Sequence, residues 1–218
     1  MHTTTMLIDV DGTLLDSNEA HARTWARVLH EHGYRTPIGE IRRMIGMGGD
    51  RILRHVDPSL DEDTEPGKTI SRKRLLLFMN EYVTQLKPTP GARALLLRLG
   101  EMGIKRVVAT SAKKDELHAL LASAGVADQI DVAVTADEAA QSKPAKDIVE
   151  NALARAGAAA NEAIYLGDTP YDVEAARGAG VACIAVRSGG WNDAALSGAA
   201  AIYDHPADLL DNINEAPI

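Results

Sequence analysis

Short apolar runs alternate with longer amphipathic segments through most of the chain. The runs are MLIDV (6–10), RVVAT (106–110), DVAVT (131–135), AIYLG (163–167) and VACIAV (181–186). They have the length of buried strands, and from residue 91 onward alanine- and leucine-rich stretches of helical length separate them. This alternation predicts repeated strand–helix–strand units, and hence an α/β fold with a doubly wound parallel sheet and helices on both of its faces.

Residues 15–87 interrupt this rhythm, because apolar residues recur there at helical spacing and no strand-like run intervenes. Two such stripes are Ala22, Trp25, Ala26 and Leu29, and Leu75, Phe78, Met79 and Tyr82. Asp16 followed by Glu19 predicts a capping box at the start of this segment, and the Pro/Gly-rich stretch LKPTPG marks its end. We therefore expect a core formed by residues 1–14 and 88–218, and a helical domain formed by residues 15–87.

Composition and charge narrow the class of protein. Of 218 residues, 45% are hydrophobic and 25% are charged, which is typical of a globular chain. The net charge of −8 argues against nucleic acid and anionic membranes as partners, because phosphate groups are bound by surplus Lys and Arg. No stretch is long and apolar enough to span a bilayer, and we expect no secretory signal in MHTTT. The single cysteine, Cys183, excludes an intrachain disulfide and favours a cytoplasmic location.

Two carboxylates stand one residue apart at the end of the first apolar run. In an extended strand, residues i and i+2 point to the same side, so Asp9 and Asp11 would share a face while Val10 turns toward the core. Two such charges repel each other unless a cation lies between them or one of them carries a proton. Gly12 can supply a tight turn or a close backbone approach to a ligand. An acidic turn at the end of a strand would also explain this motif, so the choice between a ligand site and a simple turn depends on residues elsewhere in the chain.

Further polar residues fall at or just beyond the ends of other apolar runs. They are Thr110 with Ser111, Lys143 and Asp168. Ligands of open parallel sheets bind outside the carboxyl ends of the strands, so these residues are expected to converge on the acidic pair. Together they supply what phosphoryl transfer requires: a carboxylate nucleophile, a carboxylate for proton transfer, a hard-cation site and groups that hold phosphate oxygens.

Local roles offer simpler explanations for some of these residues. Ser111 could cap the helix that follows it, and Lys143 could lie at an exposed helix start. In TPYD (169–172), threonine stands at a helix cap, proline at the first helical position and Asp172 at the third, so Asp172 could be a capping carboxylate alone. Asp168 resists such an explanation, because a carboxylate after a buried strand faces the same crevice as the acidic pair.

The chain resembles the haloacid dehalogenase-like (HAD) hydrolases, and among them the phosphoglycolate phosphatase-like branch with an inserted helical cap. Four motifs carry the resemblance, in order along nearly the whole chain: DVDGTLLDS (9–17), Thr110 with Ser111, Lys143 in SKPAKD, and GDTPYDVEAARGAGV (167–181). The resemblance implies a Rossmann-like core with a small all-helical cap. It also implies a magnesium-dependent phosphatase that hydrolyses a small phosphorylated metabolite. The second aspartate, Asp11, favours phosphatase chemistry, because the dehalogenating branch lacks it.

The resemblance implies a role for each site residue. Asp9 would attack phosphorus and form an aspartyl-phosphate, while Asp11 would protonate the leaving oxygen and then activate water. Mg²⁺ would be held by Asp9, by the backbone carbonyl of Asp11 and by Asp168. The residues that would bind the phosphoryl group are Gly12, Thr110, Ser111 and Lys143. Asp172 would act beside them as a partner of the lysine or of the metal-bound waters.

The helical cap is expected to select the leaving group. Its candidates are His21, Arg43 and Arg51, although a solvated or interdomain position would explain each of them as well. The basic run SRKR (71–74) is interpreted as a solvated helix face. Two alternatives to a phosphatase stay open: a phosphomutase of the same family, and a non-catalytic phospho-ligand binding protein, against which the intact acidic pair argues. The sequence carries no signal for an oligomeric state.

Overall fold

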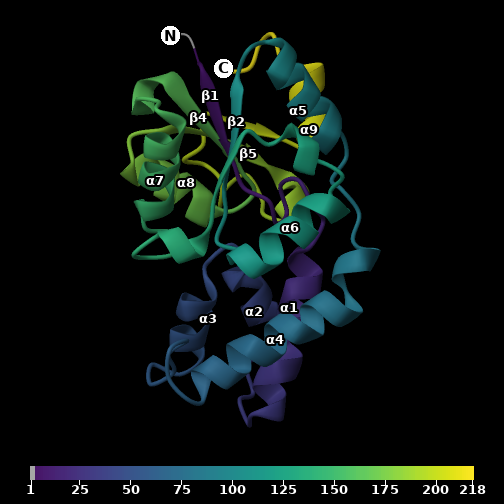
Figure 1. The fold of residues 1–218 in the computed structure, drawn as a ribbon, viewed down its shortest axis with the longest axis vertical. Helices are drawn as coiled ribbons and strands as arrows, with labels where there is room; N and C mark the ends of the chain where they lie inside the picture. Colours follow the sequence, from purple (N-terminus) through teal and green to yellow (C-terminus); the bar gives the residue numbers. More distant parts are fainter. Residues whose placement is uncertain (1–2) are drawn as a thin grey trace.

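A six-stranded parallel sheet forms the centre of the computed structural model, which describes residues 3–218 (Figure 1). Its strands are β1 (Thr5–Ile8), β2 (Lys105–Ala109), β3 (Val132–Val134), β4 (Ala163–Gly167), β5 (Ala182–Val186) and β6 (Ala201–Tyr203). Their order in the sheet is β3-β2-β1-β4-β5-β6, and every neighbouring pair is parallel. The predicted α/β fold is confirmed, and β1 to β5 coincide with the five apolar runs. The sequence pattern missed β6, because this strand is short and only partly buried.

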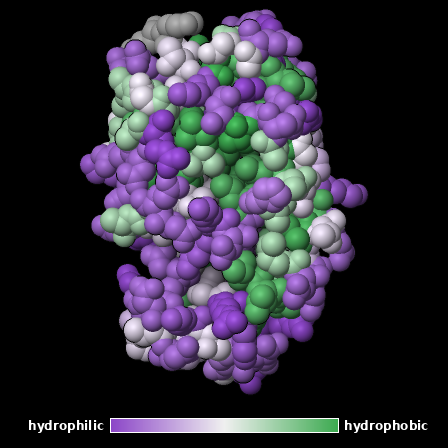
Figure 2. Space-filling model, in the orientation of Figure 1, coloured by the Kyte–Doolittle hydropathy of each residue, from purple (hydrophilic) through white to green (hydrophobic). Residues whose placement is uncertain are grey.

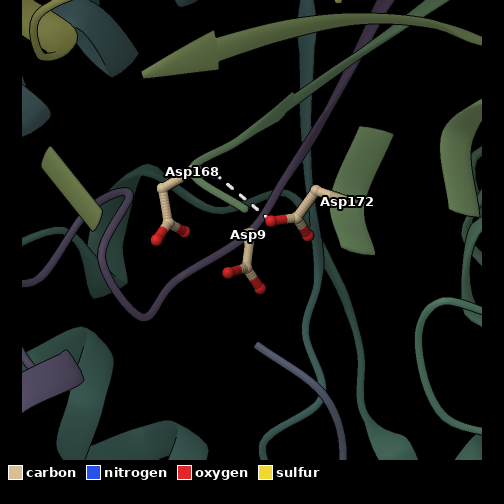
Figure 3. A group of neighbouring side chains, drawn as sticks. All are labelled: Asp9, Asp168 and Asp172. Carbon is tan, nitrogen blue, oxygen red and sulfur yellow. Dashed lines mark hydrogen bonds between the residues drawn. The ribbon is translucent and has the colours of Figure 1, made fainter. Parts of the chain in front are cut away.

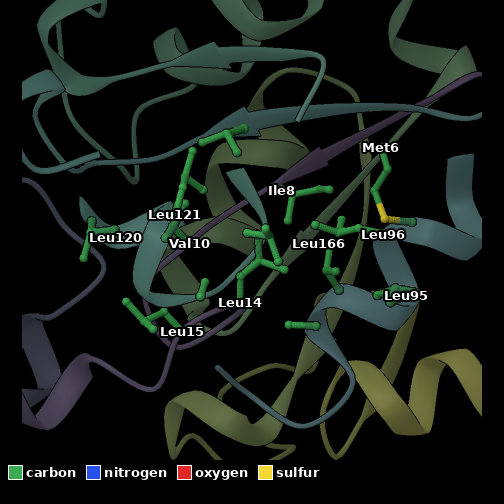
Figure 4. Close-up of a cluster of buried hydrophobic side chains, with 14 of the residues drawn as sticks. Met6, Ile8, Val10, Leu14, Leu15, Leu95, Leu96, Leu120, Leu121 and Leu166 are labelled. Carbon is green, nitrogen blue, oxygen red and sulfur yellow. The ribbon is translucent and has the colours of Figure 1, made fainter. Parts of the chain in front are cut away.

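Helices cover both faces of the sheet (Figure 1). Both faces need cover, because successive side chains of a strand point to opposite faces and those of these strands are mostly apolar. The covering helices are α5 (Ala92–Glu101), α6 (Lys114–Ser123), α7 (Asp147–Ala156), α8 (Pro170–Gly178) and α9 (Pro206–Asp211). On β1, Met6 and Ile8 pack with α5, α6 and α9, whereas Leu7 packs with α7 and α8. Figure 4 shows the first of these two clusters, with Leu166 of β4 beside Ile8. Each strand thus contributes to two apolar layers.

A separate group of helices lies at one end of the molecule, beyond the sheet (Figure 1). It consists of α1 (Asn18–Glu31), α2 (Ile38–Met44), α3 (Gly49–Val56) and α4 (Gly67–Glu81). These helices have an apolar core of their own, which includes Trp25, Leu29, Ile41, Leu53 and Ile70. Short 3₁₀ helices lie at Val83–Gln85, Ala127–Gln129, Ala136–Glu138, Ala160–Glu162 and Arg187–Gly189. No helix within residues 3–218 is long and apolar enough to cross a membrane.

The two connections between the helical group and the sheet run side by side. The backbone N–H of Asp16 donates to the carbonyl of Lys87 at 2.9 Å, and that of Thr89 donates to the carbonyl of Leu14 at 3.1 Å. These bonds lie next to the boundaries expected from the sequence. In the orientation of Figure 1, apolar surface gathers toward the right half of the molecule, near α5 and α6, and hydrophilic residues cover most of the left half (Figure 2).

The capping box predicted from Asp16 and Glu19 is wrong. Helix α1 begins at Asn18 and has Ser17 as its N-cap, without a side-chain capping bond. The carboxylate of Glu19 bonds to two arginines, Arg23 at 2.8 Å and Arg42 at 2.8 Å. The hydroxyl of Ser17 donates to the carboxylate of Asp11 instead of capping the helix.

Replacing Leu166 by alanine tests how far the fold depends on the packing of β4. Leu166 is fully buried, so Leu166→Ala is expected to lower the free energy of unfolding by about 2–5 kcal/mol through lost burial and a residual cavity. Urea denaturation measures the change. Leu97→Ala is the control, because Leu97 on α5 is 44% exposed and its loss should change stability by no more than about 0.5 kcal/mol. Equal losses in the two variants would contradict the assignment of Leu166 to the core.

Candidate active site

Three carboxylates meet at the carboxyl end of the sheet. Asp9 follows β1 and Asp168 follows β4, and these strands are neighbours, so their ends coincide. Asp172 joins them from the first turn of α8 (Figure 3). One ligand atom from each carboxylate lies within 4.8 Å of the others, and the three residues are at most 2% exposed. The topology thus brings together residues that are far apart in the sequence.

Lys143 is the buried cation of this cluster. Its Nζ lies 2.7 Å from Oδ1 of Asp9 and 2.7 Å from Oδ1 of Asp172, and the residue is 0% exposed. The alternative of an exposed helix start is therefore wrong for Lys143. One ammonium group cannot neutralise three ionised carboxylates, so the ionised cluster keeps an excess of negative charge. Burial of such an excess is costly unless a further cation compensates it.

The protonation of the cluster reflects this imbalance. Burial raises the pKa of Asp9 to about 7, although the Lys143 charge acts in the opposite direction. Burial, followed by the nearby charges of Asp172 and Asp9, raises the pKa of Asp168 well above its usual range. Burial opposes the charged form of Lys143, but the two carboxylates beside it outweigh this effect and hold its pKa well above the ordinary value. A divalent cation would favour the ionised carboxylates.

The donor set fits a hard divalent cation, because carboxylate oxygens are the ligands that Mg²⁺ prefers. Two glycines leave room for the carboxylate of Asp168, because a Cβ at Gly12 or at Gly189 would overlap it. Gly12 has a φ of +77°, a conformation that also favours glycine. The side-chain oxygen Oδ1 of Asn18 is buried without a protein donor among the described residues, as expected beside a site that holds a hydrated ion.

Asp11 has different partners from Asp9. Its carboxylate accepts a hydrogen bond from Ser17 and lies 2.7 Å from Nε2 of His21. Burial opposes its ionisation, but the charge and hydrogen bond of His21, helped by Ser17 and Arg74, hold the pKa of Asp11 below its usual range. The side chain of Asp11 is thus stabilised mainly by His21 and lies outside the three-carboxylate cluster, and the relief of the Asp9–Asp11 repulsion by a cation stays a prediction. The metal-ligand role of its backbone carbonyl stays a prediction.

His21 begins a chain of polar contacts that crosses from the helical group to the core. The residue is 3% exposed, its ring stacks on Phe78 at 4.1 Å, and its Nδ1 meets the guanidinium of Arg74 on α4. Arg74 in turn pairs with Glu116 on α6. The interpretation of SRKR as a solvated face is wrong for Arg74, whose side chain is only 12% exposed. Its position one helical turn before Phe78, on the apolar stripe, is the signal that could have identified it.

A cavity of about 320 Å³ lies between the core and the helical group, with Asp9 and Asp11 among its lining residues. Apolar side chains form part of its wall: Trp25, Ile45, Met47, Ile52 and Leu75. Two ion pairs also line it and join the helical group to α6 or the residue before it. They are Arg74–Glu116 and Lys113–Glu62, the latter at 2.8 Å. The two aspartates therefore line a partly open space with mixed polar and apolar walls.

Thr110 and Ser111 lie in the same cavity wall. The Oγ1 of Thr110 accepts a hydrogen bond from the N–H of Ala112 at 3.1 Å. The hydroxyl of Ser111 donates to the carbonyl of Gly46 at 3.1 Å, and Lys113, not Ser111, is the N-cap residue of α6. The capping alternative for Ser111 is therefore wrong.

Asp172 combines both roles that the sequence left open. It forms a capping box with Thr169, whose backbone N–H donates to Oδ2 of Asp172 at 3.0 Å, while Oδ1 accepts from Lys143. A capping role alone is thus wrong.

Arg43 and Arg51 do not reach the cavity. Arg43 is exposed, and its carbonyl accepts a hydrogen bond from Tyr171. Arg51 donates through Nε to the carbonyl of Ser142 at 3.0 Å. We therefore assign neither arginine a contact with a bound molecule in this arrangement.

The family model for haloacid dehalogenase-like hydrolases matches residues 6–186, and the chain belongs to this family of enzymes. Over 215 residues the chain is 31% identical to a phosphoglycolate phosphatase of Rhodospirillum rubrum, with 94% of this chain and 89% of the relative covered. It is 26% identical to the fructose-1-phosphate phosphatase YqaB of Escherichia coli, with 84% and 95% covered. A solved hydrolase structure from Pseudomonas syringae is 28% identical, has a TM-score of 0.89 and covers 98% of this chain and 99% of its own. The resemblance inferred from the four motifs is confirmed.

Removal of the buried ammonium tests the charge balance of the cluster. Lys143→Met is expected to lower the free energy of unfolding in EDTA by about 3–5 kcal/mol, because it leaves buried carboxylates without their partner. Mg²⁺ should recover part of this loss by supplying a replacement charge. Urea denaturation with EDTA and with Mg²⁺ measures both effects. Lys146→Met is the control, since the Lys146 side chain is 53% exposed; a similar loss in this variant would contradict the prediction.

Proposed function

We propose that the chain is a magnesium-dependent phosphatase that hydrolyses a small-molecule phosphomonoester through an aspartyl-phosphate intermediate. One observation carries the proposal: Asp9 lies in a cation-deficient cluster at the cavity, while Asp11, two residues later, is paired separately with His21. Nucleophilic displacement at phosphorus needs this division between a carboxylate that attacks and one that transfers protons. The phosphatase names of the two relatives support the same class of reaction.

The proposed reaction has two displacements at phosphorus. An oxygen of Asp9 forms a bond to phosphorus as the bond to the leaving oxygen breaks, and Asp11 donates a proton to that oxygen, which releases the alcohol. Asp11 then takes a proton from water, whose oxygen displaces Asp9 and releases phosphate. The lowered pKa of Asp11 keeps it in the ionised form that the second step requires, whereas His21 and Arg74 oppose the protonated form that the first step requires. Thr110 and Ser111 line the cavity beside Asp9, where they would hold phosphate oxygens together with Lys143 and the backbone at Gly12.

Mg²⁺ would supply the positive charge that allows an anionic carboxylate to approach an anionic phosphate. Asp9 and Asp168 would hold it, together with the backbone carbonyl of Asp11. Asp172 would act indirectly, because one of its oxygens is already bonded to Lys143 and the other to the N-terminus of α8.

The cap role of residues 15–87 belongs to the same proposal, with residues 1–14 and 88–218 as the catalytic core. Two observations support it: α1–α4 pack around their own apolar core, and they close the cavity over the aspartates. The leaving group would lie against Trp25 and its apolar neighbours. Cap closure would also position Asp11, because its partner His21 is held by Arg74, which reaches back to Glu116 of the core.

Phosphate release from a panel of small phosphomonoesters is the direct test. The parent protein should release phosphate with Mg²⁺ and not with EDTA, and Asp9→Asn should reduce turnover to the blank while its circular dichroism stays unchanged. Asp16→Asn is the matched control, because Asp16 is exposed in the same segment. Residual activity of Asp9→Asn near that of the parent would refute the nucleophile assignment. Bisphosphate-dependent transfer between sugar phosphates, with little release, would favour the phosphomutase.

Replacing Arg74 by lysine tests the contact between cap and core. Arg74→Lys is expected to lower kcat by about tenfold to a hundredfold, because an ammonium group cannot replace the guanidinium fork between His21 and Glu116, and Asp11 loses its orientation. Steady-state kinetics on the best substrate of the panel measures the loss. Arg27→Lys is the control, since Arg27 also bridges α1 and α4 but is 52% exposed. A parent-like kcat in Arg74→Lys would contradict the positioning of Asp11 through the cap.

A further inference from the structure

Asn18, the first residue of α1, reaches from the helical cap to the acidic cluster of the core. It is 6% exposed, although asparagine is usually found at protein surfaces. Its Nδ2 donates to Oδ2 of Asp168 at 2.9 Å, and the carbonyl of Gly189 lies at 3.5 Å from the same nitrogen. The cap thus touches the cluster itself as well as the cavity above it.

The side chain of Asp168 depends on neutral donors such as Asn18, because it forms no bond to Lys143. Lys143 bonds to Asp9 and Asp172, whereas the side chain of Asp168 accepts only two hydrogen bonds from the described residues, both from neutral groups. One comes from the hydroxyl of Thr13 at 3.0 Å and reaches Oδ1, and the other comes from Asn18 and reaches Oδ2. Loss of the asparagine would leave one carboxylate oxygen without a protein donor.

The other end of the Asn18 amide indicates why an asparagine stands here. Its Oδ1 is buried and has no donor among the described residues. A buried polar atom without a partner destabilises the folded protein, so such atoms normally bond to water or a ligand. A water molecule coordinated to a cation beside Asp168 would donate to this oxygen. The same amide would then hold the carboxylate through Nδ2 and the hydration shell through Oδ1.

We infer that Asn18 is a positioning residue for the metal site, which orients Asp168 toward the cation and connects metal affinity to the first helix of the cap. It touches neither the reacting atoms nor the leaving group, so it is not a catalytic residue. The inference rests on the metal site of the proposed function. It predicts that metal affinity falls when the amide is removed, because outer partners of metal ligands set their orientation.

Mn²⁺ binding to the full-length protein tests the inference without any need for turnover. Electron paramagnetic resonance of free Mn²⁺ gives the dissociation constant for the parent, Asn18→Leu and Asn18→Ala. The constant is expected to rise about 10–100-fold in both variants. Asn80→Ala, an exposed asparagine on cap helix α4, is the control and should match the parent. Parent-like affinity in both Asn18 variants would overturn the inference.

Two further readouts separate positioning from a general loss of structure. In Asn18→Ala, the Mg²⁺ concentration for half-maximal phosphate release should rise by the same factor, and kcat should return to the parent value at saturating Mg²⁺; an unrecovered kcat would contradict the inference. In the parent, Mg²⁺ should slow hydrogen exchange in the first turn of α1 but not in α3. This measurement needs no variant, so it decides the question even where a substitution prevents folding, and unchanged exchange in α1 would count against the inference.

Failure of the inference and failure of the proposed function give different results. Asn18-dependent Mn²⁺ binding without phosphate release from any phosphomonoester would refute the phosphatase and leave the inference standing. Mg²⁺-dependent phosphate release that is unchanged by substitution of Asn18 would refute the inference and leave the phosphatase standing. A parent protein that binds no Mn²⁺ would refute both.

Discussion

The excess of negative charge around Lys143 is the constraint on which the rest of the site depends. Asp9, Asp168 and Asp172 are buried together, and one ammonium group faces them. Such a cluster is stable only where cations, hydrogen-bond donors or protonation compensate the buried charges. The adjacency of β1 and β4 brings the first two carboxylates together, and the N-terminus of α8 holds the third. A bound cation would complete the compensation of the buried negative charge. The same positive charge would assist phosphoryl transfer.

The separation of Asp9 from Asp11 is the second consequence of this arrangement. Asp9 belongs to the core cluster, whereas the carboxylate of Asp11 turns to Ser17 and His21 at the start of α1. The contacts continue through Arg74 to Glu116, and therefore begin and end in the core but pass through the helical group. Two carboxylates of the same type thus reach different protonation behaviour, because one is buried in an acidic cluster and the other beside donors.

Most of the fold and the central site residues could be predicted, because both depend on local patterns. Five strands have the apolar runs of a buried parallel sheet, and a parallel sheet places the residues that follow its strands at one edge. Strand β6 escaped this pattern because it is short and partly exposed. The prediction of a capping box at α1 was wrong, because Ser17 bonds to Asp11 and Glu19 bonds to arginines. A local sequence motif carries no information about such competing partners.

The sequence by itself determined the α/β core, the helical insertion and the order of residues along the family motifs. Periodicity and short motifs express these features, because they act over a few residues. Only the tertiary structure decided which polar residues of the helical group reach the site: Asn18 and Arg74 do, whereas Arg43 and Arg51 do not. The physical reason is that such contacts join residues 42–150 positions apart, and their geometry follows from how the helical group packs on the core. Helical spacing alone does not specify that packing.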